Sequence, residues 1–403
     1  MTHRFPAIWS IRNSIAATAV GALAVASPAC ASNYVVIHDF TGGKDGATPG
    51  YTLTPDGDGR FLGATHDGGK GYGTIFELKQ KNGSWKVAPV YDFDDTQGQP
   101  GWGVVRSKRR LYVNAGYASV LGGPCGSALQ LQKSEGAPGA KWTATLMRTY
   151  VKSEDGCPTG NLLVDKNGNV FGVTQDGSAN GWGSVFELSP SGSGWTETIL
   201  HTFTGGGDGG APYSELIGDD SGNLYGTSTA CASGCWGTVF ELSPSGSGYD
   251  FKTLYAFTGG ADGGQPTAGL LMDKEGNLYG AAESAGPSGG GVVFKLTPSG
   301  SSWSYSVLAS LSGTGGPVAA LTMDKVGNLY GTSFFDGADG FGSVFELRHT
   351  AKGWKYESLH DFTGGPDGGY PGGGVVLDRD GGLYGTTVLG GANGLGVVYR
   401  ITP

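Results

Sequence analysis

The sequence AGLLMDKEGNLYGAA at residues 268–282 decides the fold, because it places two apolar runs on either side of a short polar turn. Asp, Gly and Asn are the residues that tight turns favour, so DKEGN predicts a hairpin between two strands. The next stretch, GGVVFKLTPSGSSWSYSVLASL at 290–311, contains two more strand-like runs around PSGSS. The unit therefore has four strands. Its runs are apolar on both sides, as expected for sheets that neighbouring units bury on both faces.

This four-strand unit recurs along the chain. The residue before each glycine-rich loop and the LYG position each form a ladder of seven members, and the members of the first ladder lie 51 to 57 residues apart. The first ladder consists of Phe40, Phe93, Tyr150, Phe203, Phe257, Leu311 and Phe362. Repeats of roughly 50 residues are typical of propeller blades. We predict an all-β, seven-bladed β-propeller with four strands per blade.

The two ends of the sequence complement each other. NYVVIHDF at 33–40 resembles the fourth strand of a unit, and GVVYRITP at 396–403 resembles the third. We expect the N-terminal strand to complete the last blade, which closes the ring and removes a free sheet edge. An open β-solenoid is the alternative, but it would not leave complementary fragments at the two ends. Residues 32–403 are predicted to form a single domain.

Residues 1–31 have the features of a secretory signal. Two arginines precede a short apolar run at 15–26, and ACA at 29–31 offers a cleavage site. The run is too short to span a bilayer. We expect an exported monomer, periplasmic or extracellular, without a transmembrane segment. A lipid anchor on Cys30 is the alternative, but the preceding SPA is a poor match to a lipoprotein signal.

The overall charge argues against nucleic acid as a partner. The formal net charge is −9, whereas nucleic-acid recognition needs a basic stripe. The one basic cluster, RSKRR at 106–110, is interpreted as a solvated hairpin. Glycine accounts for 78 of the 403 residues while aromatic residues reach 11%. That combination indicates short strands joined by tight turns rather than a disordered chain.

The recurring pattern GGxDGxxP…LxxDxxGNLYGTT…GxGxVFxL resembles the Gloeo/Verruco (GloVer) tandem repeat of exported bacterial proteins. The resemblance covers essentially the whole chain after residue 31. The second unit departs furthest, because DDTQGQP at 94–100 and RSKRRLYVNAG at 106–116 lack the glycine pair and the GN turn. The resemblance implies export and a repeat fold, and it brings no catalytic residues to assign.

Four cysteines follow the signal, an even number that predicts two disulfides in an oxidising compartment. Cys231 and Cys235 lie in one loop, and we pair them with each other. Cys125 and Cys157 lie in two loops that should be neighbours on one face of the ring, so we pair them as well. A zinc site is the alternative, but no histidine accompanies either pair.

The glycine-rich loops, such as HTFTGGGDGGAP at 201–212, could bind calcium, hold a phosphate or only turn the chain. Calcium takes six to eight oxygen ligands, and each loop supplies one carboxylate. A phosphate loop needs a following helix, and no helical period follows these glycines. We therefore predict structural turns in which Asp208 accepts backbone N–H bonds. No cofactor is expected, although a single structural calcium ion in the central channel remains an alternative.

Residues found in only one unit are where a site could have been added to the repeat. On the face with the longer loops we expect ligand-binding residues at Tyr51, Trp102, Tyr213, Asn114, Asp176 and Asp336. The three aromatic residues follow a loop proline near the channel mouth, where flat rings would suit stacking on sugars. The alternative is that these rings fill the channel or pack between blades.

A catalytic set is also conceivable. His66 beside Asp67, with Glu215 and Glu283 on other blades, could supply the acid and base of a glycoside hydrolase or a polysaccharide lyase. We expect a protein that binds a glycan or another envelope or extracellular ligand. The alternatives are a carbohydrate-active enzyme and a structural or protein-interaction scaffold.

Overall fold

The computed structural model describes residues 33–116, 124–134, 141–232, 234–313 and 315–403. All regular elements among them are β-strands. The expected signal at residues 1–31, including Cys30, lies outside this described part. No described residue belongs to a helix that is long and apolar enough to cross a membrane.

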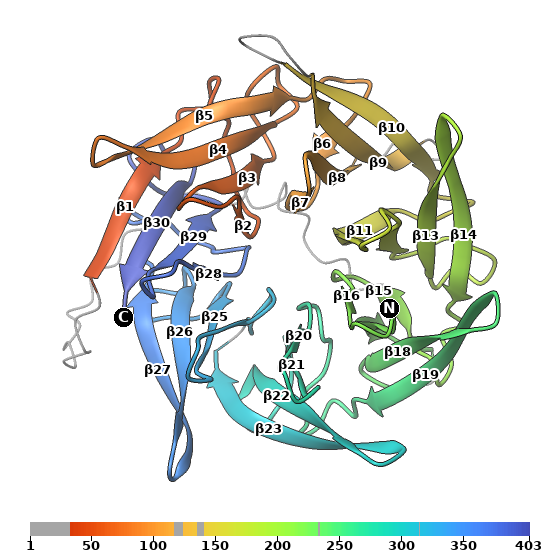
Figure 1. Ribbon diagram of the computed structural model, residues 1–403. Helices are drawn as coiled ribbons and strands as arrows, with labels where there is room; N and C mark the ends of the chain where they lie inside the picture. Colours follow the sequence, from red (N-terminus) through yellow and green to blue (C-terminus); the bar gives the residue numbers. More distant parts are fainter. Residues whose placement is uncertain (1–32, 117–123, 135–140, 233, 314) are drawn as a thin grey trace. The chain divides into compact units, whose positions relative to one another are not determined.

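Seven antiparallel sheets stand side by side in a ring, so residues 33–403 form a seven-bladed β-propeller, as predicted (Figure 1). Blades 2 and 4 have five strands, because their innermost strand is interrupted. Blade 1 contains β2 (Thr54–Pro55), β3 (Phe61–Thr65), β4 (Thr74–Lys81) and β5 (Ser84–Asp92). Blade 2 contains β6 (Gln99–Pro100), β7 (Val105–Ser107), β8 (Arg110–Gly116), β9 (Pro124–Lys133) and β10 (Trp142–Val151).

The next blades repeat this arrangement, with the first strand of each blade nearest the centre of the ring (Figure 1). Blade 3 contains β11 (Pro158–Val164), β12 (Val170–Thr174), β13 (Ser184–Ser191) and β14 (Gly194–Thr202). Blade 4 contains β15 (Gly210–Pro212), β16 (Ile217–Gly218), β17 (Leu224–Ala230), β18 (Thr238–Ser245) and β19 (Gly248–Ala256). Blade 5 contains β20 (Leu271–Met272), β21 (Leu278–Ala282), β22 (Gly289–Ser299) and β23 (Ser302–Ser312). Blade 6 contains β24 (Thr322–Met323), β25 (Leu329–Ser333), β26 (Ser343–Thr350) and β27 (Gly353–Asp361).

Blade 7 closes the ring with strands from both ends of the chain. The C-terminal region supplies β28 (Val376–Leu377), β29 (Leu383–Thr387) and β30 (Val397–Thr402), and the N-terminal region supplies β1 (Asn33–Asp39). Strand β1 pairs antiparallel with β30. The predicted closure is confirmed, and the alternative of an open solenoid is wrong for this chain.

Adjacent blades share their apolar cores. In one cluster Val185 of blade 3 packs with Phe240 and Leu242 of blade 4, and all three side chains are buried. The glycine of the LYG motif makes room for this packing. A Cβ on Gly226 would lie 2.6 Å from the Phe240 ring and 2.7 Å from Leu216. The motif pairs a glycine on one strand with a phenylalanine on the next because the ring lies over that glycine.

The turn of the D-x-x-G-N-L-Y motif is held by its aspartate. In blade 4, Asp219 Oδ1 accepts from the backbone N–H groups of Ser221 and Asn223, each at 2.9 Å. Its Oδ2 accepts from the Asn223 side chain at 2.8 Å and from the Tyr225 hydroxyl at 3.2 Å. The predicted hairpin is confirmed, and the regular spacing of Asp, Asn and Tyr within the repeat is explained by these bonds.

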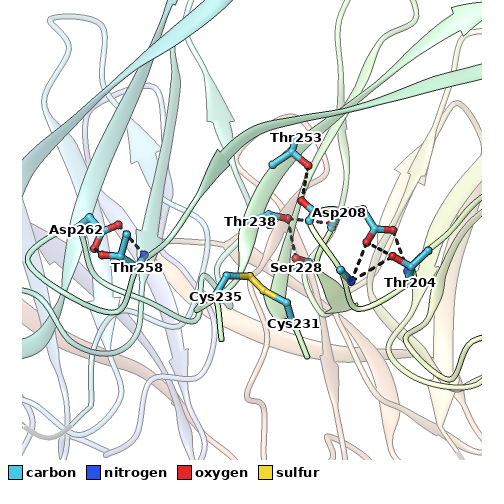
Figure 2. The surroundings of a disulfide bond; sticks show 11 residues. Thr204, Asp208, Ser228, Cys231, Cys235, Thr238, Thr253, Thr258 and Asp262 are labelled. Carbon is cyan, nitrogen blue, oxygen red and sulfur yellow. Dashed lines mark hydrogen bonds between the residues drawn. A yellow bond between two sulfur atoms is a disulfide. The ribbon is translucent and has the colours of Figure 1, made fainter. Parts of the chain in front are cut away.

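The aspartate in the glycine-rich loops of the TGGxDG type is a turn cap, as predicted for Asp208. Asp208 Oδ2 accepts from the Thr204 backbone N–H at 2.8 Å, and Oδ1 accepts from the Thr204 hydroxyl at 2.5 Å. Gly206 N–H adds a bond of 3.2 Å to Oδ1. Asp262 and Thr258 repeat the arrangement in the next blade (Figure 2). The carboxylate oxygens in these loops are thus occupied by donors of the same loop.

Both predicted disulfides are present. Cys231 and Cys235 are bonded within one loop, with their Cα atoms 5.5 Å apart (Figure 2). Cys125 and Cys157 are bonded across blades 2 and 3, with their Cα atoms 5.4 Å apart. The zinc alternative is therefore wrong for both pairs. The second bond also confirms that these loops share one face of the ring, which we call the loop-bearing face.

Candidate functional site

The inner edge of the ring is built from the residues that follow each loop proline. The third position after that proline is occupied by Thr52, Gly103, Asn161, Glu215, Gly269, Ala320 and Gly374 in blades 1 to 7. Most of these residues are small because the inner strands of adjacent blades approach closely. A Cβ on Gly103 would lie 2.9 Å from Asn161 Oδ1 and 3.2 Å from the Thr52 carbonyl. The polar side chains of Asn161 and Glu215 therefore stand out in a ring of small residues.

Three aromatic residues near this edge form a continuous row. The rings of Tyr51 and Trp102 have centroids 6.4 Å apart and are tilted by 49°. The rings of Trp102 and Tyr213 have centroids 5.0 Å apart and meet edge to face at 84°. Each of the three residues is half-buried. The structure thus brings together residues of blades 1, 2 and 4, which the sequence identified separately; we call them the aromatic row.

The pKa values of both tyrosines of the row are raised by burial and by nearby acidic side chains. Burial raises the pKa of Tyr51 well above its ordinary value, and the nearby Tyr213 and Asp67 raise it further. Burial, followed by Glu283, raises the pKa of Tyr213 to about 12. Both phenols are therefore protonated at neutral pH and act as hydrogen-bond donors. An acidic residue accompanies each of these two phenols.

The two acids hold distinct local contacts. Asp67 Oδ2 accepts from the Thr48 hydroxyl at 3.0 Å, and its Oδ1 lies 3.2 Å from His66 Nδ1. Glu283 Oε2 accepts from the Thr267 hydroxyl at 3.2 Å, and burial raises the pKa of Glu283. His66 and Glu283 each follow directly after the second strand of their blades, β3 and β21. These side chains therefore start from equivalent positions on blades 1 and 5.

Glu215 lies deeper, beside the inner edge of blade 5. A Cβ on Gly269 would collide with its carboxyl group, so the absence of a side chain there makes room for Glu215. Burial raises the pKa of Glu215, although the backbone N–H groups of Glu215 and Asn161 oppose that shift. The Oδ1 atom of Asn161 is buried and has no hydrogen-bond partner within the described part of the chain. Among the described residues, no hydrogen bond joins His66 to Glu215 or to Glu283.

The remaining sequence-predicted ligand residues make contacts within and between blades. Asn114 is 1% exposed and donates from Nδ2 to the Gly160 carbonyl at 3.0 Å, which ties blade 2 to blade 3. Asp176 accepts from the Cys157 backbone N–H at 3.0 Å, beside the disulfide. Asp336 lies in blade 6, where burial and then Asp361 raise its pKa.

Asn161 was not among the sequence-predicted site residues, although it interrupts the repeat at the inner edge. The signal that could have identified it is its register: it stands three residues after a loop proline, where blades 2, 5, 6 and 7 have Gly or Ala. The candidate site is therefore the aromatic row with Asp67 and Glu283 beside it, together with Asn161 and Glu215 on the inner edge.

Comparisons with known proteins bear on the family and the fold. Residues 125–322 match the sequence model of the Gloeobacter/Verrucomicrobia repeat, which confirms the resemblance seen in the sequence. No curated protein matches the chain. A Bacteroides uniformis structure, proposed to be a 6-phosphogluconolactonase, has a TM-score of 0.50 and 10% identity, and the match covers 77% of this chain and 83% of that one. At this identity the likeness shows the fold alone.

Two further solved structures are similar at lower scores. A proposed glucose dehydrogenase from Thermus thermophilus has a TM-score of 0.45 and 16% identity, with 75% of this chain and 93% of that chain covered. A proposed gluconolactonase has a TM-score of 0.43 and 14% identity, with 82% of this chain and 95% of that chain covered.

Proposed function

We propose that this chain, in which residues 125–322 match the Gloeobacter/Verrucomicrobia repeat, is an exported propeller that binds a glycan on the loop-bearing face, at the aromatic row. Two disulfides fit a protein that matures in an oxidising compartment. The row and its acids offer both apolar and polar contacts to such a ligand.

The observation that carries this proposal is the contact between half-buried rings from different blades. Rings at the centre of the blade cores, such as Phe240, are fully buried, and half-buried rings such as Trp303 pack against those cores. Trp102 and Tyr213 keep part of their surface exposed and meet each other at the inner edge of the ring, across blades 2 and 4. Ligand sites commonly combine such aromatic surface with a few convergent polar groups. The apolar faces of a sugar ring match the aromatic surface, and its hydroxyl groups match the polar groups.

The polar groups around the row have complementary roles toward a sugar. The protonated hydroxyls of Tyr51 and Tyr213 donate, whereas Asp67 and Glu283 accept. Asn161 Oδ1 offers a further acceptor that is unused by the described residues. A sugar hydroxyl both donates and accepts, so it can satisfy either kind of group.

The test is retention of the purified chain, residues 32–403, on a panel of immobilised neutral and acidic polysaccharides. We expect retention on at least one glycan, and we expect Trp102→Ala to weaken it about tenfold or more, since stacking and burial are lost. Trp354→Ala is the matched control, because Trp354 is also half-buried but lies on the outer strand β27. Equal loss in both variants, or no retention on any glycan, would overturn the proposal.

A carbohydrate-active enzyme is the second candidate, favoured by the contact of 3.2 Å between His66 Nδ1 and Asp67 Oδ1. A carboxylate beside an imidazole can orient it as a general base. The same panel distinguishes this candidate when release of new sugar ends is followed. Depolymerisation that His66→Ala abolishes while retention persists would identify an enzyme. If the panel shows neither retention nor cleavage, a structural or interaction scaffold is the remaining function.

A further inference from the structure

A second concave feature lies between blades 1 and 2, away from the aromatic row. It is a groove of about 1150 Å³ lined by β4, β5 and the loops on either side of β3 in blade 1, and by the β7–β8 hairpin and the adjacent ends of β9 and β10 in blade 2. Among the described residues, seven Lys and Arg side chains and three acidic ones line it, a net charge of +4. The whole chain carries −9. A strongly basic groove on an acidic protein focuses anionic ligands onto that groove.

Blade 2 departs from the repeat in the hairpin that supplies Arg106 and Arg109 to the groove. Ser107 occupies the position of the Asp that caps this turn in the other blades. Arg110 occupies the position of the residue that follows the turn glycine. On the next strand, Gln130 occupies the position of Glu241 in blade 4 and donates to the Tyr112 hydroxyl at 3.2 Å. Blade 2 therefore lacks two acidic groups that blade 4 keeps, and of the basic groups in its hairpin Arg106 and Arg109 line the groove.

Two of the acids in the groove are already neutralised. Asp56 pairs with Arg106 of blade 2, and Arg60 lies 3.9 Å from the same carboxylate. Glu77 pairs with Lys79, and its distance to Arg60 is 3.5 Å. Three cations thus balance two acids at the wall formed by blade 1. This network holds Arg60 and Arg106 in place across the blade boundary.

The rest of the lining, which comes from both blades, carries cations and aromatic surface. Lys70, Lys133 and Lys141 are exposed, and none of the three forms an ion pair with another described residue. Tyr91 and Trp142 line the same groove and are half-buried, both packed against the core between the two blades. Lysines beside flat aromatic surface match a ligand that has acidic groups on ring-shaped units.

We propose that this groove binds an anionic polysaccharide, with its carboxylate or sulfate groups at the lysines and its sugar rings on Tyr91 and Trp142. The cations are confined to one groove, whereas a nucleic acid needs a basic stripe along its backbone. A groove of about 1150 Å³ suits a short stretch of sugar units. This proposal does not depend on the aromatic row.

The test is binding of the chain to polygalacturonate and to dextran sulfate at about 0.05 and 0.5 M NaCl, with neutral dextran and a single-stranded DNA as comparisons. The test variant is K133E/K141E, because both lysines are exposed and the double reversal places repulsive charge in the groove. The matched control is K274E/K325E, which makes the same change in net charge at exposed lysines of blades 5 and 6. Thermal unfolding of both variants checks that the fold is kept.

We expect salt-sensitive binding to the anionic polysaccharides that K133E/K141E weakens roughly tenfold or more, while K274E/K325E and Trp102→Ala retain it. Binding to polygalacturonate alone would identify carboxylates as the recognised group, and binding to dextran sulfate as well would identify charge. Tighter binding to DNA than to either polysaccharide would overturn the proposal. So would equal losses in the two charge variants, or no binding. Loss in Trp102→Ala alone would assign the binding to the aromatic row.

Discussion

The indole of Trp102 meets the phenol of Tyr213 edge to face, with 5.0 Å between the ring centroids, although the two residues belong to blades 2 and 4. Edge-to-face pairs at this distance are favourable by about 0.5–1.5 kcal/mol beyond the area they bury. The contact therefore fixes the orientation of both rings before any ligand arrives. Rings held in advance lose little freedom when they bind, and a preorganised surface improves affinity.

Replacing Tyr213 separates the role of its ring from that of its hydroxyl. Tyr213→Phe keeps the edge-to-face contact and removes a donor, so we expect affinity for the retained glycan to fall about fivefold, the value of one hydrogen bond. Tyr213→Ala also removes the ring and should cost clearly more. Titration calorimetry with a soluble fragment of that glycan measures both. If Tyr213→Phe and Tyr213→Ala bind equally, the ring has no role in binding.

The fold could be predicted from the sequence because the same four-strand pattern occurs seven times. The four-strand unit, its sevenfold recurrence and the closing strand all follow from patterns of apolar residues and turns, and one blade checks another. The pairing of Cys125 with Cys157 followed from the same strand order, since that order placed two loops on one face. These features depend on local geometry and blade order, which a sequence contains.

The candidate site was only partly predictable. The sequence identified Tyr51, Trp102 and Tyr213. Their contacts with one another depend on how far each inner strand reaches toward the centre of the ring, and the spacing of the repeat does not specify that distance. The cluster at 106–110 was interpreted as a solvated hairpin because sequence does not show which charges of blade 1 face it. Arg106 in fact pairs with Asp56 of the neighbouring blade and helps form the basic groove.

The two disulfides should contribute unequally to stability. Cys125 and Cys157 are 32 residues apart and join two blades, whereas Cys231 and Cys235 are 4 residues apart within one loop. Loop-closure entropy in the unfolded chain favours the longer loop, with about 4 kcal/mol against about 2 kcal/mol. We expect C125S/C157S to lower the unfolding free energy more than C231S/C235S, as measured by denaturant titration. The reverse order would contradict this account.

The LYG glycine should be intolerant of a side chain. In Gly226→Ala the added Cβ would lie 2.6 Å from the Phe240 ring, so the core must shift, and we expect a loss of about 1–3 kcal/mol in unfolding free energy. Gly248→Ala is the control, because a Cβ there meets nothing within 4 Å. Combining Gly226→Ala with Phe240→Leu should recover part of the loss if crowding by the ring is its cause. An unchanged loss in the double variant would argue against crowding.

The histidines of the glycine-rich loops should make the propeller sensitive to acid. His201 Nε2 donates to Asp208 Oδ2 at 3.2 Å, and its ring stacks on Phe251 with 3.9 Å between centroids. Burial lowers the pKa of His201, and the contact with Asp208 opposes that shift without cancelling it. Burial likewise lowers the pKa of His360. At both sites the folded state therefore binds a proton less readily than the unfolded chain does. The free energy of unfolding consequently decreases as the pH falls below 6.5, the ordinary pKa of histidine.

Blade 4 supplies the substitution that tests this, because Tyr255 on β19 occupies the position of His201 and donates to Asp262 at 3.0 Å. We expect H201Y/H360Y to lose less unfolding free energy than the wild type between pH 7 and pH 5, as measured by denaturant titration at each pH. His349→Gln, which removes an exposed histidine outside the loops, should keep the wild-type slope. The loop aspartates are retained in every variant, and hydrogen bonds hold the pKa of Asp208 below its ordinary value of 3.8 against the opposing effect of burial. Its protonation affects stability only at still lower pH, so equal slopes for the wild type and H201Y/H360Y between pH 7 and pH 5 would remove the histidines from the explanation.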